Sequence, residues 1–449
     1  MGRLFGTDGA RGVANTELTC ELAMQIGRAA AVVLTKHTHH KPRILIAKDT
    51  RISSEMLEAA LAAGLCSVGA DAVSLGVIPT PATSYLVKKY EADAGVMISA
   101  SHNPVEFNGI KLFSSEGYKL PDKLEAEIES LIFDNPQEIT LKSGTALGRI
   151  SFCTNAKRDY IEHLISTVSV RLDGIRIALD CANGSASATA KTLFESLGVN
   201  VTVLNDKPNG GNINKNCGST HMDGLSEYVK AHDDIIGGFA FDGDADRCLA
   251  VDEAGAQIDG DQIIAAFAKY MKTNRTLKKN TAVLTVMSNF GMRAFAQKEG
   301  ISLAATAVGD RYVLEEMLKN GYNLGGENSG HIILADYSKT GDGQLTAIQF
   351  LQIVKETGLP FSEIAAVMIK SPQVMRSVYA DAQARKEYKE HPAVQEAIKE
   401  AENALGEHGR VLVRASGTEP LIRVMLEGTD EKQINRYCDM ICNTIEESF

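Results

Sequence analysis

Hydrophobic and polar positions repeat along the chain in one order, a short apolar run followed by a longer amphipathic stretch. The apolar runs lie at residues 43–47, 174–180, 234–241 and 281–286. After the first run, Leu57, Leu61 and Leu65 recur at helical spacing up to a stop near Gly69. Strands that alternate with helices in this way predict α/β domains with largely parallel or mixed sheets.

Two of the predicted helices can be bounded in more detail. Ser53 or Ser54 is the expected N-cap of the helix that follows residues 43–47, because a serine hydroxyl can accept from the first free N–H groups. The helix after residues 174–180 is expected to pass through Ala188, Leu193 and Leu197 and to stop at Gly198.

The last part of the chain has a different pattern. A charged stretch at 381–402 predicts a helix, strands are expected at 410–414 and 421–426, and a helix is expected from about Lys432. Lys370-Ser-Pro372 is the expected linker, because proline ends the preceding helix and stiffens the connection. We therefore expect three α/β domains with mixed sheets and a small C-terminal α+β domain. Their expected boundaries are 1–152, 153–253, 254–369 and 370–449.

Charge excludes one class of function. The 449 residues include 46 Lys and Arg against 57 Asp and Glu, a net charge of −11, and no strongly basic run. Such a surface repels nucleic acid, although a small phosphorylated ligand needs only a locally positive pocket. No run reaches the roughly 18 apolar residues of a membrane helix, and no apolar signal segment opens the chain. We expect neither nucleic-acid binding nor membrane insertion.

The eight cysteines are scattered and form no C-x-x-C pair, which leaves zinc or thioredoxin-like chemistry without support. Scattered cysteines in a chain of this size are typical of reduced thiols, so we expect a cytoplasmic protein. Cys438 and Cys442 lie one helical turn apart, as two small apolar residues of one helix face do.

The strongest chemical signal is Asp242-Gly-Asp-Ala-Asp-Arg247 at the end of an apolar run. Three alternating carboxylates can converge on one hard cation, and without a cation they would repel one another. A calcium loop of the EF-hand type is disfavoured because its sixth position must be glycine, whereas Arg247 stands there. A purely structural Asp-rich turn stays open. We predict a Mg²⁺ site formed by Asp242, Asp244 and Asp246, with room for a phosphate oxygen.

A second signal is Ser99-Ala-Ser101-His-Asn-Pro104, which follows an apolar run at 94–98 and precedes Asn108-Gly-Ile-Lys111. A serine directly after a strand, beside His, Asn and a rigid proline, is a candidate nucleophile. It does not have the G-x-S-x-G spacing of the hydrolases, and from this window alone a structural turn is an equal alternative.

Two further segments contain groups that suit a sugar phosphate. Gly325-Gly-Glu-Asn-Ser-Gly-His331 provides donors and acceptors for sugar hydroxyls, although a glycine-rich turn with chance polar residues would have the same composition. Arg414-Ala-Ser-Gly-Thr-Glu-Pro420, together with Arg423, combines exposed backbone N–H groups, two hydroxyls and two guanidiniums. That set favours phosphate binding over a plain hairpin turn.

The N-terminal segment Phe5-Gly-Thr-Asp-Gly-Ala-Arg-Gly12 has three glycines and one arginine, which suggests a loop near an anionic ligand. Asp49-Thr-Arg51 is a weaker signal of the same kind, and it could equally be the first turn of a helix. Taken together, the segments provide a hydroxyl nucleophile, a cation site, a hydroxyl-binding loop and a phosphate clamp. This set fits phosphoryl transfer on a sugar phosphate.

These segments resemble the motifs of the α-D-phosphohexomutase superfamily over the full length of the chain, in the same order and spacing. Within that superfamily, the N-terminal loop, Asn209-Gly-Gly-Asn-Ile-Asn214 and Cys217-Gly-Ser-Thr-His221 resemble the bacterial phosphoglucosamine mutases. Asn328 stands where phosphogluco- and phosphomannomutases usually have Met, and Ala245 replaces a commoner Gly.

The resemblance implies four domains around a central cleft, a phosphoserine at Ser101, and one Mg²⁺ per chain held by the three aspartates and the Ser101 phosphate. It implies that glucosamine 6-phosphate and glucosamine 1-phosphate are interconverted through a 1,6-bisphosphate, a step towards UDP-N-acetylglucosamine and cell-wall precursors. Members often form dimers, so a homodimer is allowed.

The resemblance also assigns roles to individual residues. Lys111 and His331 are expected to handle protons, while Arg11 and Arg247 orient or stabilise the reacting groups. The expected substrate-binding residues are Gly309, Asp310, Glu327, Asn328, Ser329, Arg414, Ser416, Gly417, Thr418 and Arg423. Two alternatives stay open: the same chemistry on glucose or mannose phosphate, and a non-catalytic sugar-phosphate sensor.

Overall fold

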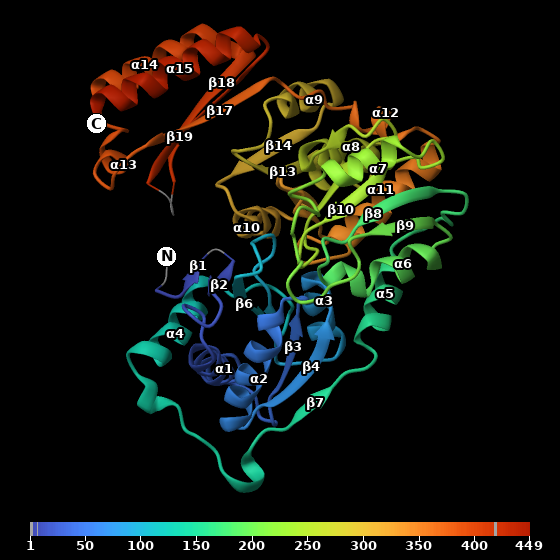
Figure 1. Ribbon diagram of the computed structural model, residues 1–449, viewed down its shortest axis with the longest axis vertical. Coiled ribbons are helices and arrows are strands. Elements are labelled where there is room, and N and C mark those ends of the chain that lie inside the picture. The colour runs from blue at the N-terminus through green and yellow to red at the C-terminus, as the bar shows by residue number, and fades with distance from the viewer. Residues whose placement is uncertain (1–2, 7, 417–419) are drawn as a thin grey trace. The chain divides into compact units, whose positions relative to one another are not determined.

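The computed structural model describes residues 3–6, 8–416 and 420–449. The chain forms two compact units (Figure 1). The first consists of residues 1–287 and 301–367, and the second of residues 288–300 and 368–449. The first unit holds three mixed sheets and the second holds one antiparallel sheet. The fold class predicted from the sequence, α/β with mixed sheets and a small C-terminal α+β part, is confirmed.

The first sheet has seven strands in the order β1-β2-β6-β5-β3-β4-β7. They are β1 (Phe5–Gly6), β2 (Gly9–Val13), β3 (Arg43–Lys48), β4 (Asp71–Val77), β5 (Ala94–Ile98), β6 (Phe107–Ser114) and β7 (Ile150–Phe152). β3 is parallel to β4 and β5, whereas β6 is antiparallel to both β5 and β2. The turn from β5 to β6 therefore leaves the sheet at the carboxyl edge of its buried central strands, and Ser101 lies in that turn.

Helices α1 (Cys20–Leu34), α2 (Ile52–Ser67) and α4 (Asp122–Phe133) pack with one face of this sheet in a common core, while α3 (Thr80–Lys89) packs on β5 (Figure 1). Gly27 on α1 and Gly64 on α2 allow the two helices to pack closely. A β-carbon at Gly27 would come within 2.6 Å of the Leu61 carbonyl oxygen, and one at Gly64 within 2.2 Å of the Met24 carbonyl oxygen. The predicted serine N-cap of α2 is wrong. Arg51 is the N-cap residue, and its side chain does not cap the helix. Ser54 lies inside the helix, and its hydroxyl donates to Asp49.

The second sheet has the order β12-β11-β10-β8-β9. Its strands are β8 (Arg176–Asp180), β9 (Asn200–Leu204), β10 (Gly238–Phe241), β11 (Cys248–Val251) and β12 (Gln257–Ile258), and its helices are α5 (Ala156–Ser166), α6 (Ala190–Ser196) and α7 (Asp223–Lys230). The helix predicted to pass through Ala188 is in fact broken there. A 3₁₀ turn at Ser185–Ala188 precedes α6, because Thr189 leaves helical geometry at the junction.

The third sheet has the order β14-β13-β15-β16. Its strands are β13 (Thr281–Thr285), β14 (Ser302–Thr306), β15 (Leu324–Gly326) and β16 (Ile332–Leu334), and its helices are α8 (Gly260–Thr273), α10 (Asp310–Asn320), α11 (Gly343–Thr357) and α12 (Phe361–Ala365). The other 3₁₀ turns are Pro136–Glu138, Gly144–Ala146, Lys278–Asn280 and Gly406–His408. The turn from β15 to β16 holds the segment predicted to bind sugar hydroxyls.

The second unit contains the antiparallel sheet β17-β19-β18. Its elements are β17 (Gln373–Tyr379), β18 (Gly409–Ala415), β19 (Leu421–Gly428), α9 (Gly291–Glu299), α13 (Ala384–Glu387), α14 (Pro392–Leu405) and α15 (Glu431–Ser448). The single helix predicted over 381–402 is wrong, because Pro392 starts a separate helix. β17, which follows the predicted linker directly, was not predicted.

Two expectations concern the whole chain. All eight cysteines are free, and Cys438 and Cys442 are both buried on α15 as predicted. No helix within the described residues is long and apolar enough to cross a membrane. The expected domain boundaries stay predictions.

Candidate active site

Ser101 lies at the start of the turn after β5, and its side chain is directed into the protein. The residue is 1% exposed, and its Oγ donates to Asp242 Oδ2 at 2.5 Å. Its backbone has a φ of +53°, in the left-handed region that a residue with a side chain rarely adopts. A candidate nucleophile thus lies in direct contact with the first aspartate of the predicted metal loop.

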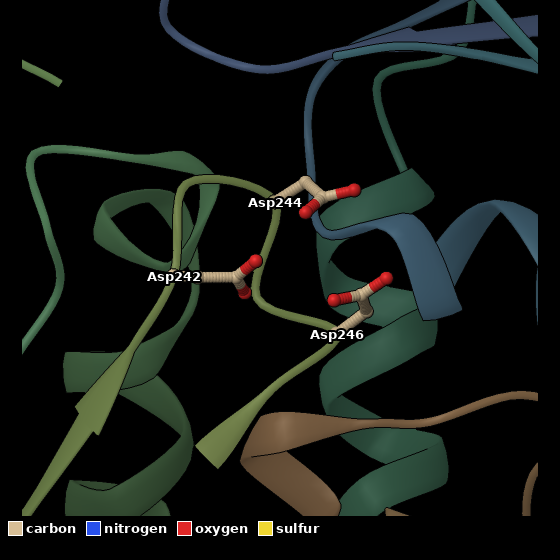
Figure 2. A group of neighbouring side chains, drawn as sticks. All are labelled: Asp242, Asp244 and Asp246. Carbon is tan, nitrogen blue, oxygen red and sulfur yellow. The ribbon is translucent and has the colours of Figure 1, made fainter. Parts of the chain in front are cut away.

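The three aspartates lie on the loop between β10 and β11 (Figure 2). All three are buried, and one carboxylate oxygen of each lies within 4.8 Å of the others. Burial, followed by repulsion from Asp246 and Asp244, raises the pKa of Asp242 to about 8. Ala245, between the second and third aspartates, has a φ of +56° that turns the loop back. The loop thus brings three carboxylates together at a place where neighbouring negative charge is costly.

The residues present fit a divalent cation that prefers oxygen ligands. Asp244 Oδ1 and Asp246 Oδ1 are buried and have no hydrogen-bond partner among the described residues. A buried carboxylate oxygen without a donor is unfavourable unless a cation neutralises it. The other oxygen of Asp244 accepts from Thr80 Oγ1 and from Lys111 Nζ. These contacts fix the carboxylate and leave Oδ1 free for a metal ion.

Lys111 lies on β6, fully buried, and points at the same carboxylates. Its Nζ is 2.7 Å from Asp244, 3.3 Å from Asp8 and 3.5 Å from Asp246. Burial alone would lower the pKa of Lys111, but the three carboxylates, led by Asp244, raise it above its ordinary value. Lys111 therefore places a positive charge next to the predicted metal loop.

Arg247 ends the aspartate loop and contacts the residue after Ser101. Its guanidinium donates to His102 Nδ1 at 3.1 Å, and its backbone N–H donates to Asp242 Oδ1 at 3.3 Å. Burial, together with the charges of Arg247 and Arg11, lowers the pKa of His102 to about 4. His102 is consequently neutral at physiological pH and accepts from Arg247.

His331 joins the aspartate loop to a chain of ion pairs. Its ring nitrogens lie 3.6 Å from Asp246 and 3.4 Å from Asp310. Burial alone would lower the pKa of His331, and the carboxylates of Asp310 and Asp246 raise it. Lys119 Nζ then bridges Asp310 at 2.5 Å and Asp8 at 2.6 Å.

Arg11 completes the group on β2. Its guanidinium forms an ion pair with Asp8, and its Nε is buried without a hydrogen-bond partner in the described part of the chain. Arg11, Lys111 and Lys119 all pair with Asp8, and a buried N–H donor in such a group is a favourable contact for an anionic ligand oxygen.

The predicted hydroxyl-binding segment is a turn between β15 and β16 with mixed exposure. Asn328 is exposed, whereas Glu327 and Ser329 are half-buried. Glu327 Oε1 accepts from the backbone N–H of Gly309 at 3.0 Å, which ties the turn to the start of α10. Ser329 Oγ has no hydrogen-bond partner among the described atoms. Donors and acceptors are thus available on this turn for a polar ligand.

The predicted phosphate clamp lies in the second unit. Arg414 and Arg423 are directly opposite each other on the antiparallel strands β18 and β19. Like charges in such a pair repel unless an anion lies between or near them. Arg385 donates to the Ser416 carbonyl oxygen at 3.2 Å, so a third guanidinium lies close by. Gly417 and Thr418 lie outside the described residues.

Within the first unit, the structure brings the predicted catalytic residues together: Ser101, Lys111, Arg247, His331, Arg11 and the three aspartates. It adds Asp8, Thr80, His102 and Lys119, which were not predicted individually. Asp8 lies in the N-terminal segment 5–12 and His102 lies beside Ser101, so the motifs around them pointed to the site. Thr80 and Lys119 had none, because only tertiary packing brings them to the site.

Comparison with known families gives four consecutive matches. The phosphoglucomutase/phosphomannomutase alpha/beta/alpha domains I, II and III match residues 2–138, 158–255 and 259–371, and the C-terminal domain of that family matches residues 375–444.

Among curated proteins, the chain is 54% identical over 448 residues to a phosphoglucosamine mutase of Clostridium novyi, covering 100% of this chain and 99% of the relative. It is 52% identical over 448 residues to a phosphoglucosamine mutase of Acetivibrio thermocellus, with the same coverage.

Among solved structures, a phosphoglucomutase/phosphomannomutase family protein of Burkholderia thailandensis superposes with a TM-score of 0.82 at 22% identity, covering 98% of this chain and 97% of that one. The N-acetylphosphoglucosamine mutase of Aspergillus fumigatus, solved with GlcNAc-6P and magnesium, has a TM-score of 0.68 at 18% identity, covering 99% and 96%. At these identities the likeness establishes the shared fold.

Proposed function

Since the chain belongs to the phosphoglucosamine mutases of the phosphoglucomutase/phosphomannomutase family, we propose that it interconverts glucosamine 6-phosphate and glucosamine 1-phosphate through a phosphoserine at Ser101. The reaction is an intramolecular phosphoryl transfer in which a 1,6-bisphosphate is the intermediate. The product is a precursor of UDP-N-acetylglucosamine and of the cell wall.

The observation that carries this proposal is the contact between Ser101 Oγ and Asp242 at 2.5 Å. It places a hydroxyl nucleophile beside two carboxylate oxygens that have no hydrogen-bond partner in the described residues. Asp242, Asp244, Asp246 and the Ser101 phosphate would hold Mg²⁺. When bound, the ion neutralises charge on the transferred phosphoryl group.

The phosphoryl transfer exchanges one oxygen–phosphorus bond for another. The bond from phosphorus to Ser101 Oγ breaks as a bond forms to the free hydroxyl oxygen of glucosamine 6-phosphate. That hydroxyl gives its proton to a side chain of the site, and Ser101 Oγ regains one. Lys111 and His331 are the proposed proton-handling groups, because each lies beside the aspartate loop that Ser101 contacts. The raised pKa of Lys111 suits it to return a proton to Ser101 Oγ rather than to accept one. Arg247 and Arg11 stabilise the phosphoryl oxygens.

The second half of the reaction requires the bisphosphate to bind in the reverse orientation. Its other phosphate then returns to Ser101 and leaves glucosamine 1-phosphate. Glu327, Asn328 and Ser329 would bind the ring hydroxyls. Gly309, whose N–H donates to Glu327, and Asp310 are also proposed to bind the substrate. Arg414, Ser416, Gly417, Thr418 and Arg423 hold the phosphate that is not reacting. We further propose that the enzyme acts in the cytoplasm, as a monomer or a homodimer.

The test replaces the nucleophile. Ser101→Ala protein should show no mutase turnover, and the wild-type Ser101 peptide should carry phosphate in mass spectrometry. Ser115→Ala, an exposed serine just beyond β6, is the matched control and should keep full activity. Full turnover by the Ser101→Ala protein would refute the proposal.

Substrate choice is tested separately, by comparing kcat/KM on glucosamine, glucose and mannose 6-phosphates. The proposal expects the highest value on the glucosamine compound. A higher value on glucose or mannose would make the chain a phosphogluco- or phosphomannomutase. Normal binding without isomerisation by the phosphorylated protein would make it a sensor.

A further inference from the structure

Ser101 has a left-handed backbone, with a φ of +53°. An L-residue with a side chain keeps that conformation only where the surrounding structure enforces it. The turn itself provides one backbone–backbone hydrogen bond, from the Asn103 N–H to the Ala100 carbonyl at 3.1 Å, and Ser99 Oγ accepts the Ser101 N–H. The remaining constraint on Ser101 must come from outside the turn.

The first outside constraint is Arg51, which is 1% exposed. Its guanidinium donates to three carbonyl oxygens of the turn: Ser101 at 3.0 Å, Asn103 at 2.8 Å and Pro104 at 2.5 Å. A guanidinium is planar and has five N–H donors in a fixed fork, so it can hold several carbonyls in one arrangement. Arg51 is the residue before α2, yet its side chain does not cap that helix.

Asp49 closes the arrangement on the other side of Ser101. It accepts from Arg51 Nε at 2.9 Å and from Ser99 Oγ at 2.6 Å. Ser99 Oγ in turn accepts the backbone N–H of Ser101 at 2.9 Å. Both backbone groups of Ser101 are therefore connected to the buried ion pair of Asp49 and Arg51. The N–H is connected to Asp49 through Ser99, and the carbonyl accepts directly from Arg51.

Asn214 provides an independent constraint from the loop between β9 and α7. Its Nδ2 donates to the Ser101 carbonyl at 2.8 Å and to the Asn103 carbonyl at 3.0 Å. Two of the carbonyls that Arg51 contacts are thus held a second time, by a residue beside the sheet that carries the aspartate loop. This contact couples the position of the nucleophile to the position of the predicted metal site.

We propose that Asp49, Arg51 and Asn214 are positioning residues that hold Ser101 in its left-handed conformation, so that Oγ stays against Asp242. None of the three touches the reacting atoms. The inference rests on the proposed phosphoryl transfer through Ser101 and adds to it which residues make that serine a usable nucleophile.

The sharpest variant is Asn214→Asp. Asn214 itself has a φ of +58°, and Asp tolerates that region about as well as Asn does. The substitution keeps the shape and removes the donor. Asn216→Asp is the matched control, because Asn216 is exposed on the same loop with a φ of +52°. Arg51→Lys is a second variant. It keeps the positive charge but removes the planar guanidinium that donates to the three carbonyl oxygens.

For Asn214→Asp and Arg51→Lys we expect kcat to fall about 10- to 100-fold, because a small displacement of a nucleophile is costly. KM should change less than about threefold, and phosphorylation of Ser101 by the 1,6-bisphosphate should slow in parallel. Asn216→Asp should match the wild type. A purely structural role would instead lower the melting temperature and leave kcat per folded molecule unchanged, which would overturn the inference.

Crystal structures of the Asn214→Asp and Arg51→Lys proteins give a readout that does not depend on turnover. We expect Ser101 to leave the left-handed region or its Oγ to move away from Asp242. An unchanged turn in both variants overturns the inference even if the wild type is inactive. Absence of turnover in the wild type, by contrast, overturns the proposed function alone.

Discussion

The carbonyl oxygen of Ser101 lies directly against Gly243: a β-carbon at position 243 would come within 2.5 Å of that oxygen and 3.0 Å of Asn214 Nδ2. Real β-carbons do not approach an oxygen so closely. The glycine between the first two aspartates therefore does more than shape the loop, since it allows the loop to pack on the serine turn.

Gly243→Ala should separate the nucleophile from the aspartates. We expect mutase activity to fall by about 100-fold, since a displacement of about 1 Å can cost that much. The overpacked site should also lower the free energy of unfolding by about 1–3 kcal/mol. Turnover and thermal melting of the same preparation check both effects.

Gly224→Ala is the control for that variant. Gly224 lies in the first turn of α7, and a β-carbon there would have no heavy atom within 4 Å. Activity should be unchanged, and stability should rise slightly because Ala favours a helix by about 1 kcal/mol. Equal activity in the two variants would contradict the packing argument.

Divalent metal should stabilise the protein through the aspartate loop. Mg²⁺ at 100 times its Kd should add about 2.7 kcal/mol to the free energy of unfolding, and excess EDTA should remove that gain together with the activity. Asp244→Asn and Asp246→Asn should abolish the thermal shift, since each neutralises a carboxylate whose Oδ1 has no hydrogen-bond partner in the described structure. Asp223→Asn, exposed at the start of α7, should keep it.

The sequence was most informative where function depends on short segments. The aspartate loop, the Ser101 turn and the strands on either side of them could be predicted, because apolar runs mark strands and chemically costly residues stand together. The contact between Ser101 and Asp242 could be expected only from the resemblance, since 141 positions separate the two residues.

Long-range partners could not be predicted. Thr80 and Lys119 reach the site through tertiary packing and stand in no noted pattern. Asn214 ends the segment 209–214, which the sequence marked only by resemblance and without indicating its contact with the serine turn. Arg51 was singled out only as a weak echo of an anion loop, and its contacts with three carbonyls depend on how β3 and β5 lie side by side. The break before Pro392 had a local signal in the proline itself, which the charge pattern of that stretch obscured.

Asp342, at the start of α11, predicts a pH dependence of stability. It is 2% exposed at the N-terminus of α11 and accepts from Tyr160 Oη at 2.9 Å and from the Leu345 N–H at 3.0 Å. Burial raises its pKa to about 7, so the folded protein holds this proton more tightly than the unfolded chain does. Its contribution to stability is therefore complete below about pH 4 and is lost as pH rises to about 7.

Asp342→Asn keeps both acceptor contacts and cannot titrate. The melting temperature of the variant minus that of the wild type should rise between about pH 4 and pH 7 and then level off. Tyr160→Phe is the control. It removes the hydroxyl that donates to Asp342, so its melting temperature should lie below that of the wild type across the whole pH range. Parallel melting curves for Asp342→Asn and the wild type would show that Asp342 titrates normally.

The proposed phosphate clamp predicts the effect of replacing Arg414 or Arg423, which face each other on β18 and β19. Arg414→Gln and Arg423→Gln should each raise KM for glucosamine 6-phosphate by about 10- to 100-fold, which corresponds to the loss of a charge-assisted hydrogen bond of about 1.5–3 kcal/mol. kcat should change less than KM, because the clamp is proposed to hold the phosphate that does not react. Arg436→Gln, exposed on α15, should leave both constants unchanged. Steady-state kinetics on the three proteins distinguish the cases, and a fall in kcat at constant KM would place the two arginines in the chemical step instead.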